Sequence, residues 1–172
     1  GDDRPEVTVE FASLSDVSGS LRPIYARTSF DDAENILFAD TAIENVGQYP
    51  TDAPLFVAIA NISDPTVLVL DSDGTTPSGV PYYDFSGMVT GGTLAPRGQT
   101  GFLSAAFLNP NGVRFTYDLV FFGQLNDAPV IGSLPRLEAF PTKSYSYDVL
   151  ATDPNGHTLR FELAQSPAGM SI

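Results

Sequence analysis

The sequence predicts an all-β chain, in which one antiparallel β-sandwich is followed by a second, incomplete sandwich. Apolar side chains recur at every second position, which is the spacing of strands with one buried face. No run with the spacing of an amphipathic helix lasts for several turns. In addition, 15 Gly and 14 Pro are scattered between the short apolar runs, as is typical of a chain with many strands and many turns.

The strands can be placed in order along the chain from this alternation. Apolar and polar positions alternate in residues 7–11, 37–43, 55–59, 113–121, 145–149 and 159–163. Residues 31–35 predict one helical turn at most. Turns rich in Gly, Asn and Pro separate the strands, and we expect about eight strands before residue 124. The side chains expected in the core are Val9, Phe11, Ile43, Leu55, Val57, Ile59, Phe107, Phe115, Tyr117 and Leu119.

Composition narrows the possible partners. The net charge is −13, with 21 acidic and 8 basic residues, and a surface this acidic repels the phosphate backbone of nucleic acids. Simple solubility is the favoured explanation of the charge. The chain has no cysteine, which excludes disulfides and thiol chemistry. No apolar stretch approaches the ~20 residues that span a bilayer, so we expect no membrane insertion.

The second sandwich is predicted to be incomplete because of its length. We expect a β-sandwich domain over residues 1–124, a short joint over 125–129 and the beginning of a second domain over 130–172. Only 47 residues follow Leu125, whereas an immunoglobulin-like sandwich needs about 100 residues and roughly seven strands. The chain is therefore expected to be a piece of a longer protein, or to borrow strands from elsewhere.

The last quarter of the chain carries an ordered series of motifs. They are Asn126, 128–130 (Ala-Pro-Val), 145–149 (Tyr-Ser-Tyr-Asp-Val), 151–156 (Ala-Thr-Asp-Pro-Asn-Gly), Leu159, Phe161, Leu163 and 166–172 (Ser-Pro-Ala-Gly-Met-Ser-Ile). In this order they resemble the start of the dystroglycan-type cadherin-like, or putative immunoglobulin-like, repeats of large bacterial surface proteins. The resemblance implies an immunoglobulin-like or cadherin-like sandwich, whose later strands are missing here.

Residues 35–124 look like a bacterial extracellular accessory sandwich of the kind found beside such repeats. This looser resemblance rests on short segments: 45–47, 54–55, 73–76, 79–82, 94–96, 107–110 and 115–117. Both resemblances imply an extracellular spacer or adhesive module without catalysis of its own.

Calcium is the cofactor that the resemblance suggests, because cadherin-type repeats bind it at the joint between sandwiches. The candidate ligands are Asn126, Asp127, Asp153 and Asn155, whose side-chain oxygens are of the type that Ca²⁺ prefers. The alternative, which we favour, is that Asp153 and Asn155 cap an ordinary turn through hydrogen bonds to the backbone. His157, the sole histidine, is interpreted as an exposed turn residue.

A second candidate site is the aromatic set Tyr82, Tyr83 and Phe85, beside Gly79 and Pro81. Exposed rings stack on the faces of sugars, so the set is a possible glycan platform. Aromatic packing in the core is the favoured alternative. The segment 71–74 is interpreted as a hairpin turn rather than a calcium loop, and the acidic residues in 31–34 as a solvated loop.

These observations favour a non-catalytic structural or adhesive module of a large extracellular or cell-surface bacterial protein. Its partners would be neighbouring domains, other copies of itself, or glycans. Two alternatives stay open at this point. The chain could be a subunit of an extracellular filament or matrix assembled by strand addition, or a carbohydrate-binding accessory module of a secreted enzyme.

Overall fold

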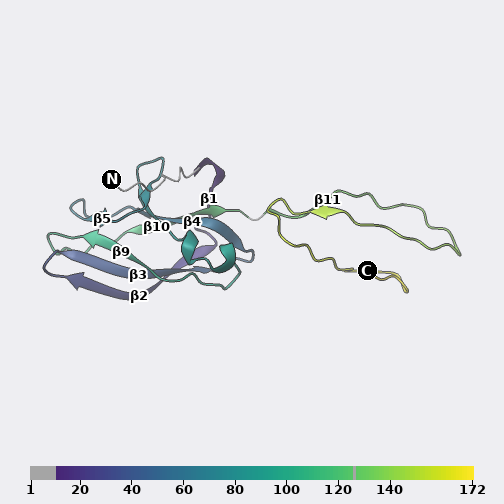
Figure 1. Ribbon diagram of the computed structural model, residues 1–172, viewed down its shortest axis with the longest axis horizontal. Helices are drawn as coiled ribbons and strands as arrows, with labels where there is room; N and C mark the ends of the chain where they lie inside the picture. Colours follow the sequence, from purple (N-terminus) through teal and green to yellow (C-terminus); the bar gives the residue numbers. More distant parts are fainter. Residues whose placement is uncertain (1–10, 126) are drawn as a thin grey trace. The chain divides into compact units, whose positions relative to one another are not determined.

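The structure is a computed structural model that describes residues 11–125 and 127–172. The chain divides into two units, Gly1–Leu125 and Asn126–Ile172, and the division falls at the start of the predicted joint. All strand pairs of the described residues are antiparallel (Figure 1), which confirms the all-β class. None of the helices in these ranges has the length and apolar character of a membrane span.

In residues 11–125 the first unit is built from ten strands and three short 3-10 helices. Several of the strands have only two or three residues, and the last two helices are separated by a single residue. In chain order the elements are η1 (Phe11–Ser13), β1 (Ser15–Asp16), β2 (Leu21–Asp31), β3 (Ile36–Asn45), β4 (Thr51–Ala60), β5 (Leu68–Leu70), β6 (Gly74–Thr75), β7 (Pro81–Asp84), η2 (Ser86–Met88), η3 (Thr90–Gly92), β8 (Thr93–Leu94), β9 (Leu103–Leu108) and β10 (Asp118–Gln124).

These strands form two sheets that share one core. One sheet has the order β1-β10-β4-β7-β6, with β8 also paired to β4, and the other has the order β2-β3-β9-β5. Figure 1 shows β2, β3 and β9 in one layer, and β4 and β10 in the other. The largest buried cluster takes Ile43 and Phe107 from one sheet and Leu55, Val57 and Phe121 from the other. Alternate residues of facing strands therefore fill the space between the sheets, as the period of two requires.

Most of the predicted core residues lie in this cluster. Ile43, Leu55, Val57, Ile59 and Phe107 are each at most 3% exposed. Three others are partly buried and pack against them: Phe115, Tyr117 and Leu119. Val9 lies outside the described residues, as do residues 7, 8 and 10 of the predicted strand 7–11.

Phe11 is predicted in a strand, but it lies in η1 and packs on the outer face of a sheet. Its ring is 5.6 Å from the ring of Phe56, 5.3 Å from that of Tyr82 and 5.6 Å from that of Phe122. Phe56 and Ala58 alternate along β4 with the core residues and are buried as well. Both faces of β4 are therefore covered, whereas the alternation predicts a strand with only one buried face.

The predicted strand 113–121 is wrong in its first half. Only Asp118–Gln124 is a strand, and its pairing with β4 begins at Asp118 opposite Ala60. β4 ends at Ala60, and Asn61 then turns the chain with φ of 52°. Residues 113–117 therefore have no strand beside them to pair with, although their apolar side chains still alternate and pack on the core. The predicted helical turn at 31–35 is also not a helix: Asp31 ends β2, and residues 32–35 form the turn to β3, with Asn35 at φ 59°.

Tyr83 connects the two sheets through its hydroxyl group. The hydroxyl donates to the carbonyl oxygen of Leu70 at 2.5 Å and accepts from the amide N–H of Ala106 at 3.1 Å. Tyr83 lies on β7, while these two residues lie on β5 and β9 of the other sheet. Both of the hydroxyl group's hydrogen-bonding functions are therefore used across the core.

We expect Tyr83→Phe to lower the free energy of unfolding by about 1–3 kcal/mol. The substitution keeps the ring but leaves the buried amide of Ala106 without this acceptor, and an unsatisfied buried group costs about that much. Urea unfolding followed by circular dichroism measures the change. Tyr49→Phe is the control, because Tyr49 is 69% exposed. Equal stability of the two variants would contradict the role assigned to the hydroxyl group.

The second unit contains little regular structure among its described residues. Its two strands are β11 (Val130–Ile131) and β12 (Ala151–Thr152), which pair with each other. The strands predicted over 145–149 and 159–163 do not form. A strand requires a neighbour for its backbone hydrogen bonds, and in this unit only two residues on each side find one in a ladder.

Candidate functional sites

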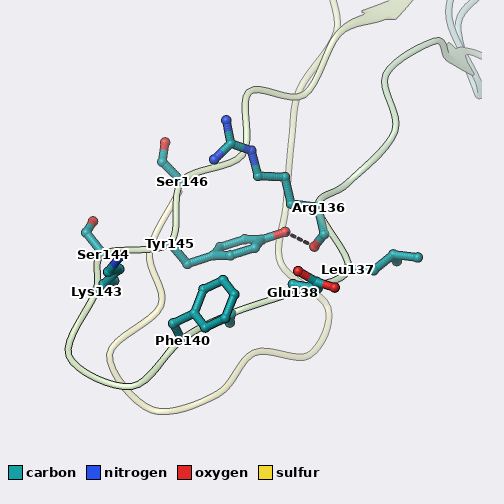
Figure 2. A pocket seen from close by; sticks show the side chains of 9 residues that line it. Arg136, Leu137, Glu138, Phe140, Lys143, Ser144, Tyr145 and Ser146 are labelled. Atoms are coloured by element: carbon teal, nitrogen blue, oxygen red, sulfur yellow. Dashed lines mark hydrogen bonds between the residues drawn. The ribbon is translucent and has the colours of Figure 1, made fainter.

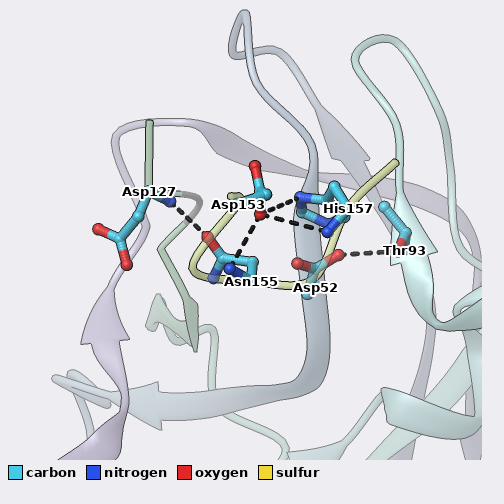
Figure 3. A network of polar contacts seen from close by, with 6 residues as sticks. All are labelled: Asp52, Thr93, Asp127, Asp153, Asn155 and His157. Carbon is cyan, nitrogen blue, oxygen red and sulfur yellow. Dashed lines mark hydrogen bonds and ion pairs between the residues drawn. The ribbon is translucent and has the colours of Figure 1, made fainter. Parts of the chain in front are cut away.

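A turn at residues 153–157 of the second unit is held by a set of polar contacts (Figure 3). The Oδ1 atom of Asp153 accepts from the backbone N–H of Asn155 at 2.9 Å and from that of His157 at 3.2 Å. The Nδ1 atom of His157 lies 3.4 Å from the same oxygen. Gly156 has φ of 79° and donates its N–H to the carbonyl oxygen of Asp153. These bonds describe an Asp-capped turn, as the Asn-Gly pair predicts.

Three of the four predicted calcium ligands, Asp127, Asp153 and Asn155, come together at this turn through hydrogen bonds. Asn126 lies outside the described residues, and the side-chain oxygen of Asn155 accepts the backbone N–H of Asp127 at 2.7 Å. The side chain of Asp153 is only 4% exposed. Within the ranges that the structure covers, no group of three or more His, Asp or Glu side chains gathers. The donor set therefore fits hydrogen-bonded turn capping better than the six to eight oxygens of calcium.

We expect calcium to leave this turn unchanged. An ion would have to displace the N–H groups that now donate to Asp153 and Asn155. The measurement is the position of the backbone amide resonances of Asn155, Gly156 and His157 as Ca²⁺ is raised to about 10 mM, well above the dissociation constants of about 0.1–1 mM of weak extracellular sites. Mg²⁺ is the control for ionic strength. Saturable shifts with Ca²⁺ alone would support the metal site that the resemblance implies.

Figure 3 also draws Asp52 and Thr93, which belong to the first unit. The hydroxyl of Thr93 donates to Oδ1 of Asp52 at 2.7 Å. This bond lies beside the pairing of β8 with β4, where Thr93 is opposite Asp52. Its role there is to hold a two-residue strand against the end of β4.

The aromatic set Tyr82, Tyr83 and Phe85 lies inside the first unit. The three residues are 7%, 4% and 2% exposed, so none of them offers a ring face to a sugar. This placement corrects the interpretation as a glycan platform in favour of aromatic packing. Burial raises the pKa of the phenol of Tyr83. Burial, with the nearby Asp84 and Asp73, also raises the pKa of Tyr82.

A hollow of about 680 Å³ lies in the second unit, between residues 136–140 and 143–146 (Figure 2). The hydroxyl of Tyr145 donates to the carbonyl oxygen of Arg136 at 2.8 Å, and the ammonium group of Lys143 lies 5.9 Å from the centre of the Phe140 ring. All of the lining residues are exposed. The hollow is therefore an open gap within a loop, without a buried polar group that would fix a ligand.

In the two other acidic segments, 31–34 and 71–74, carboxylate groups also accept hydrogen bonds from backbone N–H groups. Oδ2 of Asp73 accepts from the N–H of Asp84 at 2.7 Å. The segment 71–74 is not the predicted hairpin turn, because it carries the chain from β5 in one sheet to β6 in the other. Oδ1 of Asp31 accepts from the N–H groups of Ala33 and Glu34 and so caps the turn after β2.

Two buried amides, Asn45 and Asn109, have structural roles that the sequence does not predict. Asn45 is 0% exposed; its Nδ2 donates to the carbonyl oxygens of Tyr49 and Leu94, and its Oδ1 accepts from Gly47. Asn109 is 5% exposed and exchanges two hydrogen bonds with the backbone of Val113. Both lie at turns that the sequence marks, but an Asn that supplies positive φ and an Asn that reaches inward give the same signal.

The chain matches no protein-family model, no curated protein and no solved structure. The resemblance to cadherin-like repeats therefore stays a prediction from the residues that carry it.

Proposed function

We propose that the chain is a non-catalytic structural or adhesive module of an extracellular or cell-surface protein. Its buried polar groups support this proposal because they are engaged in holding backbone. Asn45 and the hydroxyl of Tyr83 bond to main-chain atoms of another strand, and Asn109 bonds to the main chain of its own loop. The hydroxyl of Thr100 likewise accepts from the N–H of Ile43. The acidic surface and the lack of cysteine suit a soluble module that keeps its fold in any redox environment.

The observation that carries the proposal is the pairing of the first unit's own ends. Ser15 of β1 lies opposite Gly123 of β10, and these strands are neighbours in one sheet. The chain therefore enters and leaves the described part of this unit at the same end of the sheet. A folded unit whose two connections lie together contributes little to the length that the chain spans.

At the opposite end of the first unit, side-chain hydrogen bonds connect several polar loops to one another. Asn61 donates to the carboxylate of Asp118, Asn111 donates to the hydroxyl of Thr66, and the N–H of Thr116 donates to the hydroxyl of Ser63. Loops that are tied to one another by side chains keep a constant shape at little entropic cost on binding. This end lies away from both connections of the first unit, so it is the surface that we expect the unit to present to a partner.

The proposal predicts how the chain responds to stretching. When the ends of the full chain are pulled in optical tweezers, we expect one cooperative extension of roughly 400 Å, because about 115 ordered residues are released at 3.3–3.6 Å each. The opening force is expected to be low, since β1 and β10 are pulled apart from one end and their hydrogen bonds break in turn. Gradual lengthening without a cooperative step would contradict the proposal that the first unit is a compact folded module.

A further inference from the structure

We propose that two copies of this chain pair through residues 158–164, as antiparallel strands related by a two-fold axis at Phe161. This inference goes beyond the proposed function, because it names a partner and the segment that binds it. It also gives a specific form to the alternative of strand addition.

The segment has the chemistry of a strand but no neighbour. In the described part of the chain, residues 158–166 make no hydrogen bond and belong to no strand. Figure 1 shows this part of the chain as a plain trace between β12 and the C-terminus. Phe161 and Leu163 are 43% and 39% exposed. Unpaired backbone groups beside alternating apolar side chains form a template for another strand.

The sequence of the segment is complementary to itself when two copies run in opposite directions. With Phe161 opposite Phe161 of the second copy, Leu159 lies opposite Leu163 on the same face. On the other face, Arg160 lies opposite Glu162, and this pairing occurs twice by symmetry. Aromatic pairs, aliphatic pairs and opposite charges are the cross-strand combinations that stabilise antiparallel sheets.

Other registers lose this match. A shift that centres the pair on Arg160 places two arginines opposite each other, and one centred on Glu162 places two glutamates opposite each other. A shift to a centre between two residues sets apolar side chains against charged ones. Parallel pairing in register also opposes like charges. The segment therefore specifies one partner strand, its own copy, and one alignment.

The first unit is a poor competitor for such pairing. Its longest edge strand, β2, carries Pro23, an irregular register between Tyr25 and Arg27, and the salt bridges Arg22–Glu44 and Arg27–Asp40. The other edge strands within residues 11–125, namely β1, β5, β6 and β8, have only two or three residues. Proline, charge, irregularity and short length are the features that keep sheet edges unpaired.

Charge also directs association to the second unit. Residues 1–125 hold 16 acidic and 5 basic side chains, a net charge of −11, whereas residues 127–172 hold 5 acidic and 3 basic ones, a net charge of −2. Two copies meeting through the first unit would experience strong repulsion, and those meeting through the second would not. Because the pairing is two-fold, it closes as a dimer instead of extending into a filament.

A charge-swap series on the full chain tests the pairing. By light scattering on a sizing column, we expect the unaltered chain to show a monomer–dimer equilibrium between about 10 μM and 1 mM, the range of weak interfaces. Arg160→Glu and Glu162→Arg each turn two attractive pairs into repulsive ones and should weaken the dimer about tenfold or more. The double variant restores opposite charges and should recover the dimer.

One further variant serves as a control for the charge swaps, and another tests the alignment of the two strands. Arg114→Glu makes the same change of charge as Arg160→Glu at an exposed position of the first unit, and it should leave the dimer unchanged. Since the chain has no cysteine, Phe161→Cys places a single thiol on the two-fold axis. Directly opposed antiparallel residues lie about 4.5–5.5 Å apart at Cα, within the span of a disulfide.

Oxidation should therefore cross-link Phe161→Cys about tenfold or more faster than Phe140→Cys, whose position in the same unit is 61% exposed. A monomer throughout the concentration range would overturn the proposal. So would a dimer that ignores the charge swaps, or equal rates of cross-linking at the two cysteine positions. None of these results would affect the stretching behaviour of the first unit, which tests the proposed function separately.

Discussion

Phe107→Ala is expected to lower the free energy of unfolding of the first unit by about 3–5 kcal/mol, the range for removing a buried aromatic ring. Phe107 is 0% exposed on β9, and its ring centre lies 5.4 Å from that of Phe115 and 4.9 Å from that of Tyr117. The loss combines the free energy of burying the ring with the cavity left beside the rings of Phe115 and Tyr117, which lie on a segment outside the strands. Residues 113–117 should consequently lose order together with the core.

Urea unfolding of the full chain, followed by tyrosine fluorescence and circular dichroism, measures the effect. Phe102→Ala is the matched control, because Phe102 precedes the same strand and is 53% exposed. We expect the control to change stability by no more than about 0.5 kcal/mol. If both variants lost the same stability, the ring of Phe107 would not be the centre of the core.

Asn45→Asp is expected to cost several kcal/mol at neutral pH. The substitution removes the two N–H donations to the carbonyl oxygens of Tyr49 and Leu94, and each buried acceptor left alone costs about 1–3 kcal/mol. It also points a carboxylate at those carbonyl oxygens in a site that is 0% exposed. The loops after β3 and before β8 should open together, since one side chain holds both.

The cost of this substitution should fall in acid. Burial raises the pKa of a carboxyl group, so the introduced group becomes neutral as the pH falls through its folded-state pKa, and the neutral acid can donate one hydrogen bond again. Unfolding free energies at pH 7 and about pH 4, near the ordinary carboxyl value, give the comparison. Asn111→Asp is the control, because Asn111 is exposed. A loss in Asn45→Asp that is equal at both values, relative to the control, would contradict the model of a buried charge.

The parts of the fold that depend on side-chain period could be predicted from the sequence. The alternation at Leu55, Val57 and Ile59 placed β4 and its inward face correctly. It could not show that Phe56 and Ala58 would also be covered, because the covering ring of Phe11 comes from a separate segment. Alternation reports a side chain's preference for one face, and it contains no information on what lies over the other.

Strand pairing was harder to predict than burial. Residues 113–117 and 159–163 carry the same alternation as true strands, yet neither has a strand beside it. Of the candidate sites, the turn at Asp153 was predicted correctly in its hydrogen-bonded form, because an Asp-capped Asn-Gly turn is a local structure. The burial of Tyr82, Tyr83 and Phe85 depends on the second sheet, which no local signal describes.

The buried amides have a consequence for the resistance of this protein to chemical modification. In a chain without cysteine, Asn45 ties the loop after β3 to Leu94 and Asn109 closes its own loop at Val113, so there is no disulfide that reducing agents could break. The chemical threat to an asparagine is deamidation, in which the next residue's backbone nitrogen attacks the side chain. Asn109 precedes Pro110, which has no N–H for that attack, and Asn45 precedes the branched Val46. The asparagines followed by glycine, Asn111 and Asn155, lie in turns outside the core. Their conversion to a carboxylate would not disrupt the packing of the two sheets.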